Sequence, residues 1–447
     1  MRLAFSMLLL AHAAVAADAN LLAPTPPMGW NSWDSYALTV TQADYLANAN
    51  YMASNLRQHG WTYAVIDEGW FLGNPDAKPP AKFEYTMDEN GRFTPATNRF
   101  PGSSGDAGFQ KLAQEIHNRH LLFGIHIVRG IPREAVARDL PIAGSHYHAA
   151  EAANKSDVCA WNSDNYGVAA NAAGQAYYDS VAALYASWGV DLVKIDCISE
   201  PYKSDEIRMF SEALRKTKRP IVLSLSPGPT PIDKIAELRK YAQMWRISGD
   251  MWDHWAQWPK AGWSQGLLAQ FDLAAQWAPL VEPGHWPHAD MLPFGYLGPA
   301  PGFGNPRQSA FTPDEQRTMR TLWSIMRSPL MIGANLTRLD EATKALLTND
   351  DVLAVDQHST GGRQVSKDVA KMVWAARGDK PGTAYVALFN TGDGAQTVEY
   401  PLQSLGMASV SFAIRDLWQH KDIGTADRVS AKLPPHASAL FRVIASK

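Results

Sequence analysis

The chain has 447 residues, enough for two or three domains with a large core. Charged residues make up 19% of it and we find no low-complexity tract, which is typical of a soluble globular protein. The formal net charge of −3 gives no reason to expect nucleic acid or an anionic membrane as a partner.

The N-terminus has the pattern of a secretory signal. Arg2 is the only charge before an apolar run that ends at Leu10, and small residues follow through Ala16. We expect residues 1–17 to be a signal peptide. The apolar run is too short to cross a membrane, and no later segment is long enough. The sequence therefore predicts a periplasmic or secreted protein without a membrane span.

The only two cysteines are Cys159 and Cys197. An exported protein meets an oxidising environment, which permits a disulfide between them. Two free buried thiols are the alternative, and spacing alone does not separate the two possibilities.

Apolar, β-branched runs recur along the first 340 residues, and helical patterns such as 110–119 and 175–187 lie between them. We expect eight strands, within residues 26–36, 63–70, 121–129, 188–196, 221–229, 242–250, 284–292 and 328–336. Strands that alternate with helices in this way predict a (β/α)8 TIM barrel over residues 18–362.

The helix with the clearest start signal follows the seventh of these strands. Thr312 is suited to be the N-cap, Pro313 the first helical residue, and Glu315 the third member of a capping box. Its apolar positions recur at helical spacing, which predicts a helix with one buried face.

From residue 363 the pattern changes to short alternating runs separated by glycine, proline and aspartate, with no helical period of useful length. The sequence predicts a C-terminal antiparallel β-sandwich domain over residues 363–447.

Acidic residues end two of the expected strands. Lys194 and Asp196 close the run WGVDLVKID and, two residues apart, leave a strand on the same side. We expect the lysine to keep the carboxylate ionised. Asp250 closes the later run MWRISGD. Two carboxylates at the mouths of two barrel strands indicate glycoside hydrolysis, although a structural ion pair is the alternative for Lys194 and Asp196.

A metal site is the second interpretation of the polar residues. His285, His288 and Asp290 have a spacing that a metal could use, and His146 and His148 form another cluster. A metallohydrolase barrel usually has a His-x-His pair on its first strand, and the first expected strand of this chain has none. We therefore expect neither a metal nor a cofactor.

Six motifs occur in the order found in one family. They are PPMGWNSW, the Asp67-Glu68 pair, WGVDLVKID, the WR…D stretch, ADML and SPLMIG. With the C-terminal β-domain, they make the chain resemble the melibiase-type α-galactosidases of glycoside hydrolase family 27, over nearly all of its mature length.

The resemblance implies a retaining mechanism, with Asp196 as the nucleophile and Asp250 as the general acid/base. It also implies that eight further residues contact the sugar: Trp33, Asp67, Glu68, His126, Lys194, Ser226, Arg246 and Asp290.

Four positions depart from the family pattern. Glu68 stands where α-galactosidases have a second aspartate, and a glutamate there is found in the family's β-L-arabinopyranosidases. Ser226 lies about where N-acetylgalactosaminidases carry serine, and His126 stands where tyrosine is usual. Cys197 directly follows the expected nucleophile, so the resemblance implies the family's disulfide to Cys159 in a shifted position.

By frequency within the family, the resemblance favours an α-galactosidase that releases terminal galactose from an oligosaccharide or glycoconjugate. The alternatives are a β-L-arabinopyranosidase or an α-N-acetylgalactosaminidase. An inactive carbohydrate-binding protein is the alternative from another class, but it would not need both Asp196 and Asp250.

Overall fold

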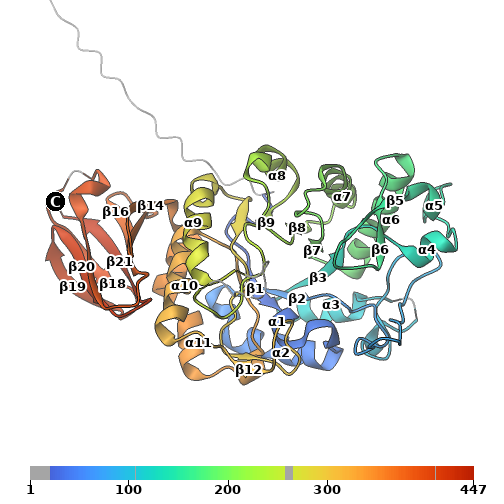
Figure 1. Ribbon diagram of the computed structural model, residues 1–447, viewed down its shortest axis with the longest axis horizontal. Helices are drawn as coiled ribbons and strands as arrows, with labels where there is room; N and C mark the ends of the chain where they lie inside the picture. Colours follow the sequence, from blue (N-terminus) through green and yellow to red (C-terminus); the bar gives the residue numbers. More distant parts are fainter. Residues whose placement is uncertain (1–20, 106, 257–264, 408, 447) are drawn as a thin grey trace, which may run out of the picture.

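The structure is a computed structural model that describes residues 21–446 except 106, 257–264 and 408. The expected signal peptide lies outside the described residues. The chain forms a barrel joined at one end to a smaller β-domain (Figure 1).

The first domain is built on eight parallel strands, which confirms the predicted barrel. In chain order they are β1 (Met28–Asn31), β2 (Tyr63–Ile66), β3 (Leu122–Val128), β7 (Leu192–Asp196), β8 (Val222–Leu225), β9 (Met244–Arg246), β10 (Trp286–His288) and β13 (Leu330–Ile332). Each lies within a predicted run and is shorter than it. The sheet runs from β10 through β7 and β1 to β13. A parallel bridge from Leu292 to Ile332 joins its two edges.

The strands pack closely enough that some positions have no room for a side chain. A Cβ on Gly29 of β1 would lie 2.1 Å from the carbonyl oxygen of Tyr63 on β2. Glycine at this position therefore lets the first two strands pair in register and brings their carboxyl ends together.

Helices connect the strands and surround them. The longer ones are α2 (Gln42–Asn55), α3 (Gln110–His117), α6 (Ala172–Trp188), α7 (Ser204–Lys216), α9 (Leu267–Trp277), α10 (Pro313–Met326) and α12 (Asp350–His358). Both α3 and α6 lie where the sequence predicts helices. Between them, the helices and strands bury large aromatic side chains, among them Trp30, Trp245 and Trp323.

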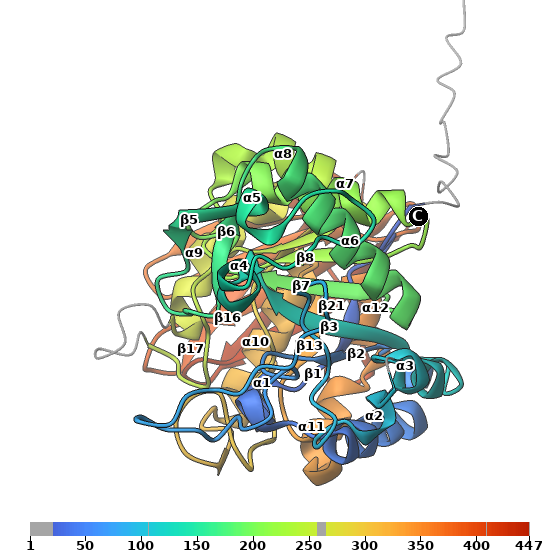
Figure 2. The ribbon, with the colours of Figure 1, turned by 90° about the vertical axis from the view of Figure 1, so that its right-hand side faces the viewer.

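A small antiparallel sheet interrupts the barrel after β3, and the sequence did not predict it. Its strands are β4 (Ile131–Pro132), β5 (Ala153–Val158) and β6 (Asn165–Val168), in the order β4-β6-β5. We call residues 131–168 the β3–α6 insert. It lies at the end of the molecule opposite the second domain and faces the viewer in Figure 2.

The second domain is an antiparallel β-domain that begins with β14 (Thr360–Asp368), as the C-terminal pattern predicts. Its larger sheet also contains β15 (Lys371–Arg377), β16 (Thr383–Asn390), β21 (Ser438–Ala445), β18 (Phe412–Asp416) and β19 (Lys421–Ala426). Two strands, β17 (Gln396–Pro401) and β20 (Arg428–Leu433), form a smaller sheet. Side chains from both sheets, including Val386, Val398 and Phe441, form one core.

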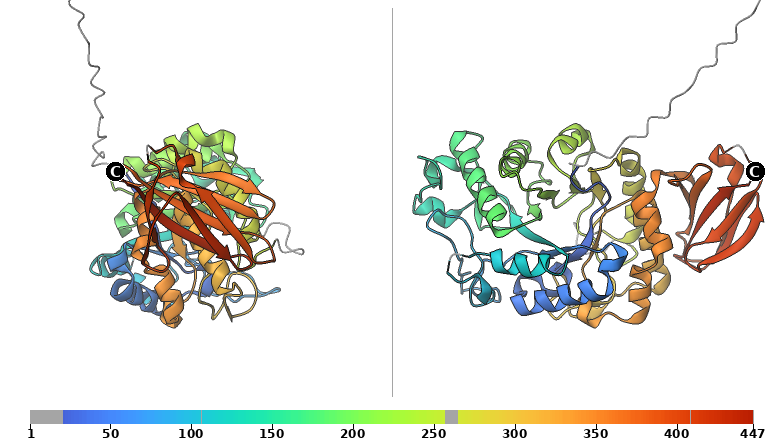
Figure 3. Two further views of the ribbon diagram at one scale, coloured as in Figure 1. Left: turned by 90° about the vertical axis from the view of Figure 1, so that its left-hand side faces the viewer. Right: turned by 180° about the vertical axis from the view of Figure 1, so that it is seen from behind.

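Helix α10 packs against elements of both domains, and in Figure 3 the orange helices at this end of the barrel lie beside the C-terminal β-domain. Thr318 donates a hydrogen bond to the carbonyl of His436 at 2.6 Å, and Trp418 donates one to Thr321 at 3.0 Å. Because one face of α10 packs in the barrel and these residues contact the sandwich, the helix helps to hold the domains in one arrangement.

A capping box stabilises the start of α10 and can be tested by mutation. Thr312 accepts from the backbone N–H of Glu315 at 3.2 Å, and Glu315 accepts from the N–H of Thr312 at 2.8 Å, which confirms the predicted capping box. We expect Thr312→Ala to lower the free energy of unfolding by about 1 kcal/mol, measured by urea denaturation. Thr312→Ser keeps the oxygen and should retain nearly all of the stability; equal losses in both variants would contradict this role.

Candidate functional site

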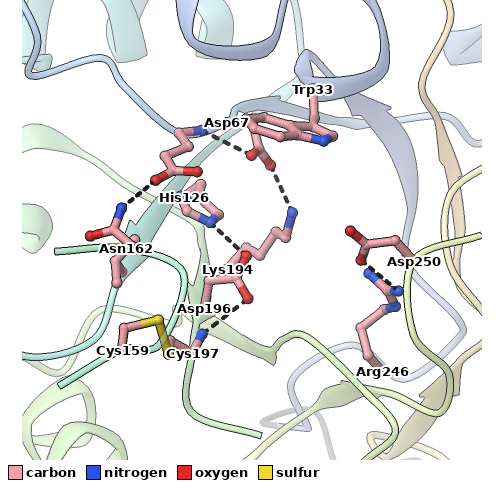
Figure 4. Close-up of polar contacts among 12 residues, drawn as sticks. Trp33, Asp67, His126, Cys159, Asn162, Lys194, Asp196, Cys197, Arg246 and Asp250 are labelled. Carbon is pink, nitrogen blue, oxygen red and sulfur yellow. Dashed lines mark hydrogen bonds and ion pairs between the residues drawn. A yellow bond between two sulfur atoms is a disulfide. The ribbon is translucent and has the colours of Figure 1, made fainter. Parts of the chain in front are cut away.

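Polar side chains gather where the carboxyl ends of the parallel strands meet, which is where barrels of this kind place their active sites. Asp67 directly follows β2, His126 lies on β3, and Lys194 and Asp196 lie on β7. In the register of the sheet, His126 is paired with Lys194. These side chains point into one space, with Asp250 on its opposite side (Figure 4).

Lys194 forms its ion pair with Asp67 and not with Asp196. Its Nζ lies 2.9 Å from Oδ2 of Asp67, which also accepts a 2.6 Å hydrogen bond from the side chain of Asn31. Burial raises the pKa of Asp67, but the charges of Lys194 and His126 outweigh it and hold that pKa well below its usual range. Burial lowers the pKa of Lys194, and the two aspartates more than reverse that effect.

Asp196 is held by two donors, one on each carboxylate oxygen. His126 Nε2 lies 3.1 Å from Oδ2, and the backbone N–H of Cys197 donates to Oδ1 at 3.0 Å. Burial raises the pKa of Asp196, but the hydrogen bond from His126 and the charge of Lys194 bring it below its usual value. Lys194 thus contributes to keeping Asp196 ionised, as the sequence predicts, although it does so without a direct contact. The carboxylate is ionised and oriented.

Asp250 lies in the loop after β9 and faces the same space. Arg246 Nη2 is 3.2 Å from Oδ1 of Asp250 and 2.7 Å from Oδ2 of Asp290. Asp290 also accepts the backbone N–H groups of Met251 and Met291, both at 2.8 Å. Its φ of 88° is rare for a residue with a side chain, and these contacts maintain it. Asp290 is buried, whereas 37% of the Asp250 side chain is exposed, so Asp250 is accessible to a ligand.

Glu68 forms another part of the boundary of this space. It is 9% exposed, and its Oε1 accepts a 2.8 Å hydrogen bond from the side chain of Asn162. Burial raises the pKa of Glu68 to about 7; His126 opposes the shift, and the charges of Asp196 and Asp67 add to it. Glu68 therefore exchanges its proton near neutral pH.

Asn162 is itself fixed by its neighbours. Its Oδ1 accepts the backbone N–H of Asp164 at 2.8 Å, and its Nδ2 also donates to the Asp164 carboxylate at 3.2 Å. Tyr85 donates a hydrogen bond to the other oxygen of that carboxylate. Asp164 and Tyr85 thereby orient the amide that contacts Glu68.

The two remaining predicted residues are Trp33, at one wall of the site (Figure 4), and Ser226, at its floor. The Trp33 indole packs so closely on the backbone of Gly302 that a Cβ there would lie 2.2 Å from its Nε1. Ser226 lines a narrow cavity of about 20 Å³ together with Lys194, Arg246 and Asp290. All ten predicted catalytic and sugar-contacting residues thus lie in or around one space.

A disulfide joins Cys159 to Cys197, as the resemblance implies, across a sequence separation of 38. Cys159 belongs to the β3–α6 insert, and Cys197 directly follows Asp196. The bridge therefore ties the segment that carries Asn162 to the strand that carries Asp196.

The histidines considered for a metal do not converge. His285 directly precedes β10 and contacts the carbonyl of Ala242, which lies before β9, at 3.1 Å. Asp290 follows the opposite, carboxyl end of β10. His288 lines the cavity under the site, where burial lowers its pKa well below the usual value. In the described parts of the chain, no group of three histidine, cysteine, aspartate or glutamate side chains could hold a metal ion.

None of the described helices is both long and apolar enough to cross a membrane.

Asn31 and Asn162 contact the site but are not among the site residues predicted from the sequence. Asn31 ends β1 within the PPMGWNSW motif, so its place at a strand end was a usable signal. Asn162 lies in a polar loop, and only its closeness to Cys159 in sequence could have pointed to it.

The shifted pKa of Glu68 predicts a pH-dependent stability. An unfolded Glu68 loses its proton near the ordinary glutamate pKa of 4.5, whereas the folded protein retains it up to about pH 7, because burial raises the pKa. The unfolded state binds fewer protons across that window, so stability falls as pH rises from 4.5 to 7. We expect Glu68→Gln, which resembles the neutral acid, to gain up to about 3 kcal/mol over the wild type across this window, measured by urea denaturation.

Glu89 is exposed in the same β2–α3 connection, so Glu89→Gln is the matched control and should track the wild type at every pH. A Glu68→Gln curve that stays parallel to the wild-type curve would rule out the raised pKa.

Comparisons with known proteins identify relatives of both domains. Residues 155–358 match the family described as alpha galactosidase A, and residues 370–443 match the alpha galactosidase C-terminal beta sandwich domain. The chain is 26% identical to an α-galactosidase of Oryza sativa subsp. japonica, over 94% of this chain and 85% of the relative.

Solved structures also resemble it. A family 27 β-L-arabinopyranosidase from Geobacillus stearothermophilus, solved in complex with arabinose, is 43% identical, with a TM-score of 0.89 over 95% of this chain and 98% of that one. α-Galactosidase I from Mortierella vinacea shares the fold at 23% identity, with a TM-score of 0.74 over 96% and 99% of the two chains. Two matched domains and a 43% identical relative, over nearly the whole described length, show that the chain is a melibiase-type member of glycoside hydrolase family 27.

Proposed function

We propose that the protein is a retaining glycosidase that releases terminal β-L-arabinopyranose. The observation that carries the sugar assignment is Glu68, a buried carboxyl group held at the edge of the site by Asn162. β-L-Arabinopyranose has the ring configuration of α-D-galactopyranose but lacks the hydroxymethyl group. A glutamate extends one methylene further than an aspartate and fills room that this group would need.

The 43% identical relative supports this choice, because it is a β-L-arabinopyranosidase. α-D-Galactosides are the second candidate substrates, because the curated relatives that match the chain at about 26% identity are α-galactosidases. The proposed sugar therefore differs from the galactose that the resemblance alone favours, whereas the proposed retaining mechanism is the same.

The mechanism assigns the two aspartates different roles. Asp196, ionised beside His126 and Lys194, attacks the anomeric carbon while Asp250 donates a proton to the leaving oxygen. A covalent glycosyl-enzyme forms, and Asp250 then takes a proton from the water that releases the sugar. Two displacements retain the configuration, and this requires the two carboxyl groups to lie about 5–5.5 Å apart.

The remaining polar residues bind and orient the sugar. Asp67, Lys194 and Asp290 offer carboxylate and ammonium groups for its hydroxyls. Arg246 keeps Asp250 and Asp290 in place through two ion pairs. Trp33 supplies an aromatic wall, Ser226 lies at the floor, and His126 orients the nucleophile.

The proposal includes export from the cytoplasm. The disulfide between Cys159 and Cys197 supports it, since such bonds persist in oxidising compartments.

The sugar preference is tested with initial rates on nitrophenyl glycosides of β-L-arabinopyranose, α-D-galactose and α-N-acetyl-D-galactosamine. We expect kcat/KM for the arabinoside to exceed that for the galactoside at least about tenfold, the range set by one methylene in a pocket. Glu68→Asp should narrow or reverse this ratio, while Glu89→Asp should leave it unchanged. A wild-type enzyme that is faster on the galactoside would instead identify an α-galactosidase.

The nucleophile and acid/base assignments are tested separately. We expect Asp196→Ala to lower kcat/KM at least about a thousandfold on every active substrate. Asp250→Ala should regain turnover of nitrophenyl glycosides when azide is added, with a glycosyl azide of retained configuration as product. Activity that survives Asp196→Ala, or an azide product of inverted configuration from Asp250→Ala, would overturn the assignments.

A further inference from the structure

A second hollow, of about 650 Å³, lies between the β2–α3 connection and the β3–α6 insert. We call it the aromatic hollow. Its lining includes Lys82, Phe83, Tyr85, Phe93, Arg133 and Asp164. None of these is among the proposed catalytic or sugar-contacting residues, and none lines the narrow cavity under Lys194 and Arg246.

One side of the aromatic hollow is a group of packed rings. Phe93 stacks on the buried Phe71 with ring centroids 4.1 Å apart, and Tyr85 stacks against both rings, with centroids 5.7 Å from Phe93 and 6.1 Å from Phe71. Phe83 meets Tyr85 edge-on at 6.4 Å. Stacking against the buried Phe71 holds these rings in place, so they offer a preformed apolar surface of the kind on which the C–H face of a pyranose packs.

The polar side of the aromatic hollow carries both signs of charge. Lys82 and Arg133 are cationic, and Glu134 and Asp164 are anionic. The Arg133 guanidinium lies over the Tyr166 ring at 4.8 Å, and its buried Nε has no hydrogen-bond partner within the described part of the chain. Balanced charges give no preference for an ionic ligand, while the many donors and acceptors suit a neutral ligand rich in hydroxyl groups.

The aromatic hollow shares residues with the boundary of the barrel site. Tyr85 and Asp164 line it, and they hold Asn162, which in turn contacts Glu68. This row of hydrogen-bonded side chains therefore links the boundary of the barrel site to the lining of the aromatic hollow. A glycan that places its terminal sugar in the barrel would extend beyond it along the surface.

From this we propose that the aromatic hollow is an accessory subsite for a neutral pyranose unit of the glycan chain that carries the cleaved sugar. The proposal rests on the glycosidase assignment but does not depend on which terminal sugar is released.

Binding is tested in full-length Asp196→Asn protein, with L-arabinose added to saturation so that the barrel site is filled. The ligands are β-1,4-mannopentaose and β-1,3-galactopentaose, two backbone oligosaccharides that carry neither an α-linked galactose nor a β-L-arabinopyranose at their ends. We expect calorimetry to detect binding of at least one of them. Phe83→Leu keeps the apolar volume but loses the flat ring, and should weaken that binding about fivefold. Phe83→Tyr keeps the ring and should bind as the parent does.

Kinetics with Asp196 intact gives a second readout. Phe83→Leu should raise KM for a polymeric branched glycan about fivefold relative to KM for the nitrophenyl glycoside of the same sugar, and Phe83→Tyr should not. An absence of oligosaccharide binding, equal binding by Phe83→Leu and the parent, or a parallel rise of both KM values would each overturn the proposal. An inactive enzyme that still binds the oligosaccharide through Phe83 would contradict the proposed function and support the subsite.

Discussion

The ion pair between Lys194 and Asp67 lies at the centre of a crowded set of buried charges. Asp67 and Asp196 lie at the carboxyl ends of β2 and β7, the strands on either side of β3, where two carboxylates would otherwise repel each other and lose their hydration. Lys194 contacts the first at 2.9 Å and lowers the pKa of the second through space. His126 adds a hydrogen bond to Asp196, so both carboxylates remain ionised within one small space.

A second cation organises the other side. Arg246 contacts both Asp250 and Asp290, and the Asp290 carboxylate also accepts two backbone N–H groups. Lys194 thus ties the strand of the proposed nucleophile to Asp67, and His126 contacts the nucleophile itself. Arg246 fixes the loop that carries the proposed acid/base. Glu68 lies outside both arrangements. It has an amide donor and, among the described residues, forms no ion pair, which agrees with its raised pKa.

The environment of Glu68 depends on the β3–α6 insert and not on the barrel alone. Asn162 reaches Glu68 because Asp164 and Tyr85 hold its amide and because a disulfide ties Cys159 to the end of β7. The proposed sugar preference and the aromatic hollow thus both depend on segments added to the barrel. Such segments can change without disturbing the strands that carry the proposed nucleophile, which is how one fold serves several substrates.

The barrel strands, the capped helix α10 and the β-sandwich could all be predicted from sequence, because each rests on a local pattern of apolar spacing, capping residues or turn residues. The same patterns placed Lys194 and Asp196 on one side of a strand end. The insert could not be predicted this way, because its strand β5 reads ANKSDV and is half-exposed, without an apolar period. The partners were also beyond local pattern: Lys194 binds Asp67, 127 residues away, and Asn162 binds Glu68, 94 residues away. Sequence periodicity determines the side from which a side chain leaves its own strand, whereas its partner depends on how strands and loops distant in sequence pack together, and only the tertiary structure decides that.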